Sequence, residues 1–423
     1  MRVGIVGAGW AGLACAVEAV SLGHEVQLFE MAAQPGGRAR SIDAGGLALD
    51  NGQHILIGAY RDTLASMRRV GVDVDAAFLR LPLALLKPDG RGLRLPGGAP
   101  VPAFVRGVIA HRGWRWAERL ALLGAAARWR LGGFRCDPDT DVASFTARLP
   151  EAVRRDVIEP LAVAALNTPA HEASAAVLLR VLHDALFGGP GSSDLLLPRV
   201  ALSELLPEPA RRWLQARGAQ LRSGARVGAI ERAGGGWRVD GEPVDAVVLA
   251  CGPLESARLA EPHAAPWAAL ARALRFQPIA TVYLEAEPAA VWPCPMLALQ
   301  SDTTRPAQFA FDLGALHGAA ARGRIALVAS GVADWLDRGT PALEAAALAQ
   351  AARQLGGLCR GAPRVLRTIV EKRATFACTP GLRRPPQRVA PGLLAAGDIA
   401  EGPYPATLEG AVRSGIAAAR ALP

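Results

Sequence analysis

The chain has 423 residues, of which 51% are hydrophobic, 20% are charged and 5% are aromatic. At roughly 100–200 residues per domain this length predicts two or three domains, and the apolar fraction excludes a disordered chain. The formal net charge is +9, but the arginines are scattered and no zinc-finger, basic-zipper or RNP motif is present, so we expect no nucleic-acid partner.

The first 30 residues predict a strand, a glycine-rich turn, a helix and a second strand. Val3–Val6 form the first strand, and the turn Gly7–Gly12 has the sequence GAGWAG. This G-x-G-x-x-G pattern between a strand and a helix indicates dinucleotide binding, with the phosphates at the helix N-terminus. Glu30 ends the second strand, where a carboxylate is expected to bind a ribose and to disfavour NADP.

Two further motifs follow the second strand. Gly37, Arg38 and Arg40 belong to a glycine pair followed by two arginines at alternate positions, which can hold guanidinium groups against phosphate or flavin oxygens. A solvated loop is the alternative. The stretch Leu49–Tyr60 is the most distinctive part of the chain, because it carries a glutamine and a histidine on a glycine-opened turn.

Beyond residue 82 the sequence changes in character. A long helix is predicted at 116–130, within a helical region that ends near residue 194. The region that follows is predicted to contain a helix at 210–217 and strands at 220–222, 226–230, 237–239 and 245–250. Later elements are strands at 280–285, 296–300, 325–329 and 393–396 and helices at 341–355 and 407–421.

These elements predict an α/β protein with two interleaved domains. A parallel-sheet nucleotide domain is expected from three pieces, 1–82, 195–256 and 365–423. A second domain of α+β type is expected from the two pieces between them, 83–194 and 257–364.

The glycine turn, Glu30 and the sequence Gly36-Gly37-Arg38 together resemble the flavin amine oxidase and phytoene desaturase superfamily. This resemblance implies a Rossmann-type domain that binds FAD and a separate substrate-binding domain. It also implies that Gly397 and Asp398 hold the ribityl chain. We therefore expect FAD to contact Gly7, Gly9, Ala11, Gly12, Glu30, Gly37, Arg38, Arg40, Gly52, Gln53, His54, Val227, Gly397, Asp398, Thr407 and Leu408.

Within this superfamily the chain resembles the hydroxysqualene dehydroxylases, the squalene-associated FAD-dependent desaturases of bacterial hopanoid pathways. The resemblance rests on GAGWAG, on GGRARS at 36–41, on the 49–60 stretch and on YPATLEG at 404–410. It implies that the allylic hydroxyl of hydroxysqualene leaves as water while a hydride from reduced FAD replaces it. The implied partners are this long isoprenoid and neighbouring squalene-pathway enzymes.

Such a reaction needs a proton donor for the departing hydroxyl group. His54 is the leading candidate, because imidazole titrates near neutrality and the resemblance places this loop beneath the flavin. Contact with FAD or structural packing is the alternative role for His54. Tyr404 and Glu409 are further candidates, and Glu409 can instead cap or pair within its helix. No metal site is expected.

Residues 111–135 resemble a helix that lies on a membrane surface. Trp116, Leu120 and Leu123 fall on one helical face, and six arginines crowd the segment. An ordinary surface helix is the alternative. We expect a cytoplasmic protein, with peripheral contact to an anionic membrane at its inner face, because the six cysteines show no C-x-x-C spacing and no segment is apolar enough to span a bilayer.

Two other functions stay open from the sequence. One is a different FAD-dependent enzyme of the superfamily, either an isoprenoid desaturase or an amine oxidase. An amine oxidase usually has an aromatic cage beside the flavin, and this chain has only three tyrosines. The other is a non-catalytic isoprenoid-binding escort protein on the same fold, which would not need to keep Arg38, Arg40 and Asp398.

Overall fold

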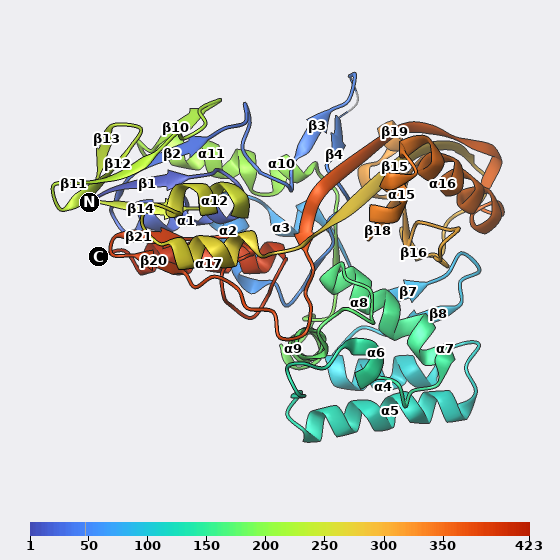
Figure 1. Ribbon diagram of the computed structural model, residues 1–423. Helices are drawn as coiled ribbons and strands as arrows, with labels where there is room; N and C mark the ends of the chain where they lie inside the picture. The colour runs from blue at the N-terminus through green and yellow to red at the C-terminus, as the bar shows by residue number, and fades with distance from the viewer. Residues whose placement is uncertain (47) are drawn as a thin grey trace.

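The computed structural model describes residues 1–46 and 48–423. A six-stranded sheet lies at the end of the molecule that holds both termini (Figure 1). Its strand order is β10-β2-β1-β14-β21-β20, and all neighbours are parallel except β20 and β21. The strands are β1 (Arg2–Val6), β2 (Glu25–Glu30), β10 (Gln220–Ser223), β14 (Ala246–Leu249), β20 (Arg388–Ala390) and β21 (Leu393–Ala395).

Both faces of this sheet are covered, which explains the continuous apolar runs in β1 and β14. On one face α1 (Trp10–Ser21) packs against α17 (Leu408–Arg420), beside α2 (Arg61–Arg69) and α11 (Pro207–Gln215). A Cβ on Gly415 of α17 would lie 2.1 Å from the Ala11 carbonyl oxygen, so glycine permits this close helix crossing. The other face is covered by α12 (Pro253–Ala260), α13 (Ala265–Arg272), β11 (Ile230–Ala233), β12 (Gly236–Val239) and β13 (Glu242–Val244).

A second, antiparallel sheet has the order β16-β17-β18-β15-β19. Its two longest strands pair with one another along most of their length. The five strands are β15 (Phe276–Pro288), β16 (Met296–Ala298), β17 (Phe309–Asp312), β18 (Arg324–Ser330) and β19 (Cys359–Phe376). The helices α14 (Leu313–His317), α15 (Ala333–Asp337) and α16 (Thr340–Gln354) follow its strands in the chain.

A layer of helices lies below this second sheet in Figure 1. It consists of α4 (Pro100–Ile109), α5 (Trp116–Leu131), α6 (Val142–Phe145), α7 (Glu151–Val153), a π-helical turn (Arg154–Ile158), α8 (Glu159–Leu166) and α9 (Ala175–Phe187). One apolar cluster joins these helices. Within the part of the chain that the structure describes, no helix is both long and apolar enough to cross a bilayer.

Short elements connect the layers. They are β3 (Ser41–Asp43), β4 (Ala48–Asp50), β5 (Leu56–Ile57), α3 (Val74–Ala77), β6 (Phe78–Leu81), β7 (Ala84–Leu86), β8 (Gly92–Arg94), β9 (Leu195–Pro198) and α10 (Leu202–Leu205). The strand β9 pairs with both β5 and β6, so residues 195–198 lie beside the N-terminal part of the chain.

The predicted fold class is confirmed, since a parallel sheet with a βαβ start is joined to a second α+β unit. The strand expected at 226–230 is wrong: this segment is a loop, and β11 begins only at Ile230. The Asp240 side chain accepts hydrogen bonds from the backbone N–H groups of Gly228 and Ala229. These two N–H groups therefore do not donate to a neighbouring β-strand. The proposed domain boundaries stay a prediction, and the one between 364 and 365 falls inside the continuous strand β19.

Candidate functional site

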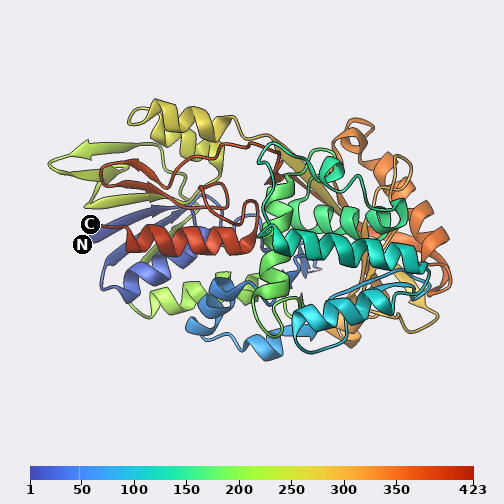
Figure 2. The ribbon, with the colours of Figure 1, turned by 90° about the horizontal axis from the view of Figure 1, so that it is seen from below.

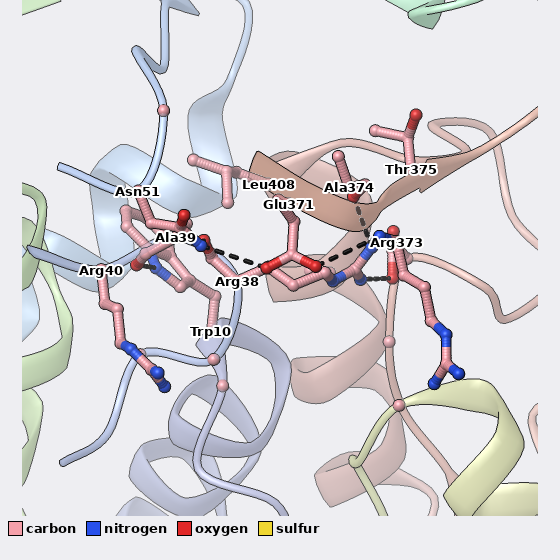
Figure 3. A pocket seen from close by; sticks show the side chains of 18 of the residues that line it. Trp10, Arg38, Ala39, Arg40, Asn51, Glu371, Arg373, Ala374, Thr375 and Leu408 are labelled. Atoms are coloured by element: carbon pink, nitrogen blue, oxygen red, sulfur yellow. Dashed lines mark hydrogen bonds and ion pairs between the residues drawn. The ribbon is translucent and has the colours of Figure 1, made fainter. Parts of the chain in front are cut away.

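A cavity of about 920 Å³ opens at the carboxyl ends of β1, β2, β14 and β21. Its opposite wall comes from the second sheet, of which Figure 3 shows the end of β19, and from α8. The carboxyl edge of a parallel sheet is where ligands of such folds bind. All of the residues predicted to bind the cofactor line this cavity except Gly12.

The three motif glycines have different reasons to be glycine. Gly7 has φ +108°, and a Cβ there would lie 2.6 Å from the Ala250 carbonyl oxygen. A Cβ on Gly12 would lie 1.8 Å from the Gly7 carbonyl oxygen. Around Gly9, by contrast, the only heavy atom of the described residues within 4 Å of such a Cβ is Gly37 Cα, at 3.8 Å. The fold therefore requires Gly7 and Gly12, whereas Gly9 leaves open space over the helix end.

The N-terminus of α1 supplies hydrogen-bond donors to this space. Gly9 is its N-cap and provides no side-chain cap, so the first backbone N–H groups of the helix stay available to an anion. Beside it, the buried Glu30 carboxylate accepts from Ala8 N–H (2.7 Å) and Ala32 N–H (2.8 Å). These bonds fix the carboxylate at the end of β2, and its remaining lone pairs can accept from ribose hydroxyls.

Arg38 joins the N-terminal motif to the C-terminal one. Its guanidinium donates to Asp398 Oδ1 (2.5 Å) and to the Ala374 carbonyl oxygen (2.7 Å) at the end of β19. Figure 3 shows Arg38 at the centre of the view and the Arg40 side chain pointing away from Arg38. The buried Arg40 Nε has no hydrogen-bond partner among the described residues, so it is free to donate to a ligand.

The 49–60 stretch lines the cavity through residues 51–55 and Tyr60. Asn51 Nδ2 donates to Glu371 Oε2 on β19 (3.2 Å), and Gln53 Nε2 lies 3.2 Å from the Tyr283 hydroxyl oxygen. His54 Nδ1 lies 3.2 Å from the Gly52 carbonyl oxygen. Burial lowers the pKa of His54 below its ordinary value near 6.5, so the ring is mostly neutral at pH 7.

The N-terminus of α17 also reaches the cavity. Thr407 caps this helix by accepting a hydrogen bond from Gly410 N–H (3.0 Å), and both Thr407 and Leu408 line the cavity. The helix end therefore brings a partial positive charge to this wall.

The two other catalytic candidates lie elsewhere. Of the described residues, those that line the cavity include neither Tyr404 nor Glu409. The Tyr404 hydroxyl donates to the Asp184 carboxylate of α9. Glu409 is fully buried and accepts from Thr63 N–H (3.0 Å) and Thr63 Oγ1 (2.7 Å) at the start of α2. These contacts give both residues bracing roles between elements, because neither side chain faces the cavity.

The second sheet forms a cavity wall that local sequence patterns do not reveal. Pairs two residues apart line the cavity on four of its strands, which is the spacing of one strand face. They are Ile279 and Thr281 on β15, Phe309 and Phe311 on β17, Val328 and Ser330 on β18, and Ile369 and Glu371 on β19. The strand periodicity could have shown that these residues share a face, but not that this face meets the glycine turn.

The residues at hand fit a dinucleotide that carries a flavin. Gly9 leaves room for a pyrophosphate, and Glu30 lies at the end of β2, where a ribose is expected. The buried Arg40 Nε–H can donate a hydrogen bond to the ligand, since it has no acceptor among the described residues. The cavity volume is at the upper end of the roughly 300–1,000 Å³ that ligand sites occupy.

Comparisons with known proteins agree with this geometry. Residues 10–423 match the family model described as flavin containing amine oxidoreductase. The chain is 27% identical to a hydroxysqualene dehydroxylase from Sinorhizobium fredii and 28% identical to one from Rhodopseudomonas palustris, and both alignments cover 99% of this chain and 97% of the relative. An oxidoreductase from Methanosarcina mazei superposes with a TM-score of 0.73 at 16% identity, covering 99% of both chains. The predicted superfamily resemblance and the FAD cofactor are thus confirmed.

Proposed function

Because this chain belongs to the family of flavin-containing amine oxidoreductases, we propose that it converts hydroxysqualene to squalene with FAD as its cofactor. The observation that carries the proposal is the similarity to two hydroxysqualene dehydroxylases along 99% of the chain. The apolar wall of Ile279, Phe309, Phe311 and Ile369 opposite the flavin motifs supports it, since a hydrocarbon needs such a surface. We place the reaction in the supply of squalene for hopanoids.

The proposed reaction breaks the allylic C–O bond and forms a C–H bond at the same carbon. The hydroxyl oxygen takes up one proton and leaves as water, while a hydride replaces it, so the substrate is reduced by two electrons. FAD supplies that hydride when it is bound in its reduced form. The protein must then hold the hydrocarbon, exclude bulk water and deliver the proton.

The cavity residues divide these tasks in our proposal. The apolar side chains of β15, β17 and β19 hold the isoprenoid chain and exclude water. Arg38, Asp398 and the α1 N-terminus bind the cofactor. The polar side chains that line the cavity include Asn51, Gln53, His54, Thr281 and Glu371. We place the departing hydroxyl group among them.

If His54 donates the proton, turnover depends on its imidazolium form. The lowered pKa means that the imidazolium form predominates only below a pH that is itself lower than 6.5. We therefore expect turnover by the reduced enzyme to be constant at acidic pH and to fall about tenfold per pH unit above that pKa. In a His54→Gln variant the turnover rate should no longer depend on pH in this way and should be about 10²–10⁴-fold lower. Rapid-mixing measurements of flavin reoxidation from pH 5 to 8 would show both effects.

The matched control is His171→Gln, because His171 is exposed and does not belong to the residues that line the cavity. This variant should keep the wild-type rate and pH profile. A His54→Gln enzyme that binds FAD and turns over at the wild-type rate would exclude His54 as the proton donor. The polar groups on the opposite wall, Thr281 and Glu371, would then be the next to substitute.

The proposed reaction is tested under anaerobic conditions. The purified protein, reduced in one series and oxidised in a second, is mixed with hydroxysqualene, phytoene or a primary amine, while flavin absorbance and products are followed. Reoxidation by hydroxysqualene alone, with squalene as product, supports the proposal. Reduction of the oxidised protein by phytoene or by the amine would instead show a desaturase or an amine oxidase. A protein that binds hydroxysqualene but turns over none of these compounds would favour the escort alternative.

A further inference from the structure

Exposed apolar side chains concentrate on α4 and α5. Ten large hydrophobic side chains are exposed among the described residues, and five of them lie within residues 105–131. These five are Val105, Ile109, Trp116, Leu120 and Leu131. The remaining five are spread over the rest of the chain, as single exposed hydrophobics normally are. We call the exposed surface of α4 and α5 the α4–α5 face.

The helix α5 is apolar on two opposite sides. Leu122 and Ala125 are buried and belong to the apolar cluster of the helical layer. At about 100° per residue, Trp116, Leu120 and Leu131 fall within about 60° of one another on the opposite side. Their side chains are 61%, 62% and 88% exposed. A surface helix needs only one apolar side to pack on its own protein. On the second side Leu123 packs against the apolar cluster, whereas the described residues leave Trp116, Leu120 and Leu131 largely exposed.

The charge around this second side is almost entirely positive. Residues 100–135 contain seven arginines and a single acidic residue, Glu118. Glu118 is buried, accepts from the backbone N–H of Arg115 and forms an ion pair with its guanidinium. Arg119 lies over the Trp116 ring, with Cζ 4.8 Å from the ring centroid. Arginines therefore border the exposed apolar side chains, as in helices that lie in the headgroup region of a bilayer.

The α4–α5 face lies on the outside of the helices that form part of the cavity wall. The apolar cluster that buries Leu122 continues to Ala162 and Leu166 of α8. On the same helix α8, Val163, Ala164 and Ala165 line the cavity. Figure 2 views the molecule from the side of this layer and shows α4 and α5 turned toward the viewer. The helical layer thus lies between the α4–α5 face and the cavity.

We propose that the α4–α5 face docks on the surface of an anionic lipid bilayer. Its apolar side chains would enter the headgroup and upper acyl region, while the bordering arginines contact lipid phosphates. The docking itself follows from the exposed side chains and the charge. Docking would let an isoprenoid dissolved in the membrane reach the cavity. Only this purpose rests on the proposed function.

The test is flotation of the FAD-loaded protein with vesicles of phosphatidylglycerol and phosphatidylcholine, and with phosphatidylcholine vesicles alone. We expect strong binding to the anionic vesicles and at least tenfold weaker binding to the neutral ones. An Arg112→Glu/Arg128→Glu/Arg135→Glu variant should bind anionic vesicles at least ~100-fold more weakly. A Leu120→Gln/Leu131→Gln variant should lose about tenfold or more, because two apolar contacts with the bilayer are removed.

The matched control reverses the same amount of charge on other elements. Arg68, Arg353 and Arg388 are exposed residues of α2, α16 and β20, and their triple substitution by glutamate should change binding less than threefold. Circular dichroism and flavin content check that each variant is folded. Equal vesicle binding by the wild type and both α4–α5 variants would overturn the proposal. Concentration-dependent dimerisation through this face without vesicle binding would overturn it as well.

A second readout separates this proposal from the proposed function. Flavin reoxidation by hydroxysqualene dissolved in detergent should be the same in the wild type and the Leu120→Gln/Leu131→Gln variant. The same substrate embedded in anionic vesicles should react more slowly with the variant. Vesicle binding without any reaction would support the docking surface and exclude the proposed substrate.

Discussion

A Gly9→Ala variant should fold like the wild type and lose most of its affinity for FAD. The backbone at Gly9 is extended in a way that alanine adopts, and the added Cβ would meet only Gly37 Cα, at 3.8 Å. The same methyl group would occupy the space over the α1 N-terminus that a pyrophosphate needs. Loss of even one or two charge-assisted hydrogen bonds, at about 1.5–3 kcal/mol each, weakens binding by ~10-fold to more than 1,000-fold. Fluorescence titration of the apoprotein with FAD measures this change.

Two further glycines make the comparison decisive. A Gly12→Ala variant should be destabilised even without FAD, because its Cβ would overlap the Gly7 carbonyl oxygen at 1.8 Å. A Gly97→Ala variant should match the wild type in both properties, since the described residues leave open space around that position. Thermal unfolding of the three apoproteins separates effects on the fold from effects on the cofactor. If Gly9→Ala binds FAD as tightly as Gly97→Ala does, the pyrophosphate does not lie over this turn.

An Arg38→Ala variant should lose both stability and cofactor affinity. In the apoprotein the substitution leaves the Asp398 carboxylate, which is 8% exposed, without the guanidinium that it contacts at 2.5 Å. Because Arg38 itself is partly exposed, we expect a loss of about 1.5–3 kcal/mol in the free energy of unfolding. The substitution also removes a cation from the cavity wall. Urea unfolding of the apoprotein and FAD titration measure the two effects separately.

A double variant tests the cause of the instability. In Arg38→Ala/Asp398→Asn the uncompensated carboxylate is gone, so most of the lost stability should return while FAD binding stays weak. Arg388→Ala, on the exposed strand β20, is the matched control and should change neither property. A double variant that is no more stable than Arg38→Ala would contradict the role assigned to this ion pair.

Local sequence was sufficient for the cofactor half of the site. A G-x-G-x-x-G turn needs only a strand before it and a helix after it, and both lie within the first 21 residues. Glu30 is the last residue of β2, and Arg38 follows a local glycine–arginine motif, so both could be inferred from motif and spacing. Asp398 was expected at the cofactor from the resemblance to the superfamily. For this reason the predicted cofactor residues, with the exception of Gly12, line one cavity.

Local sequence did not decide which side chains of the α17 N-terminus reach the cavity. Leu408 and Glu409 are adjacent in sequence, but successive residues of a helix point about 100° apart. Leu408 therefore faces the cavity while Glu409 turns to α2. A motif specifies that both residues belong to the α17 N-terminus, and only the packing of that helix decides which of them meets a ligand.

The sequence by itself determined that this chain folds around a dinucleotide site and which residues form its phosphate end, because those features depend on backbone conformation within one βαβ unit. The tertiary structure alone decided what faces the flavin motifs. Asn51 and Glu371 are 320 positions apart, and they meet only because β19 packs beside the segments that carry Arg38 and Asn51. The apolar wall and the two-sided helix α5 arise in the same way, since burial is a property of what packs against a residue and not of the residue itself.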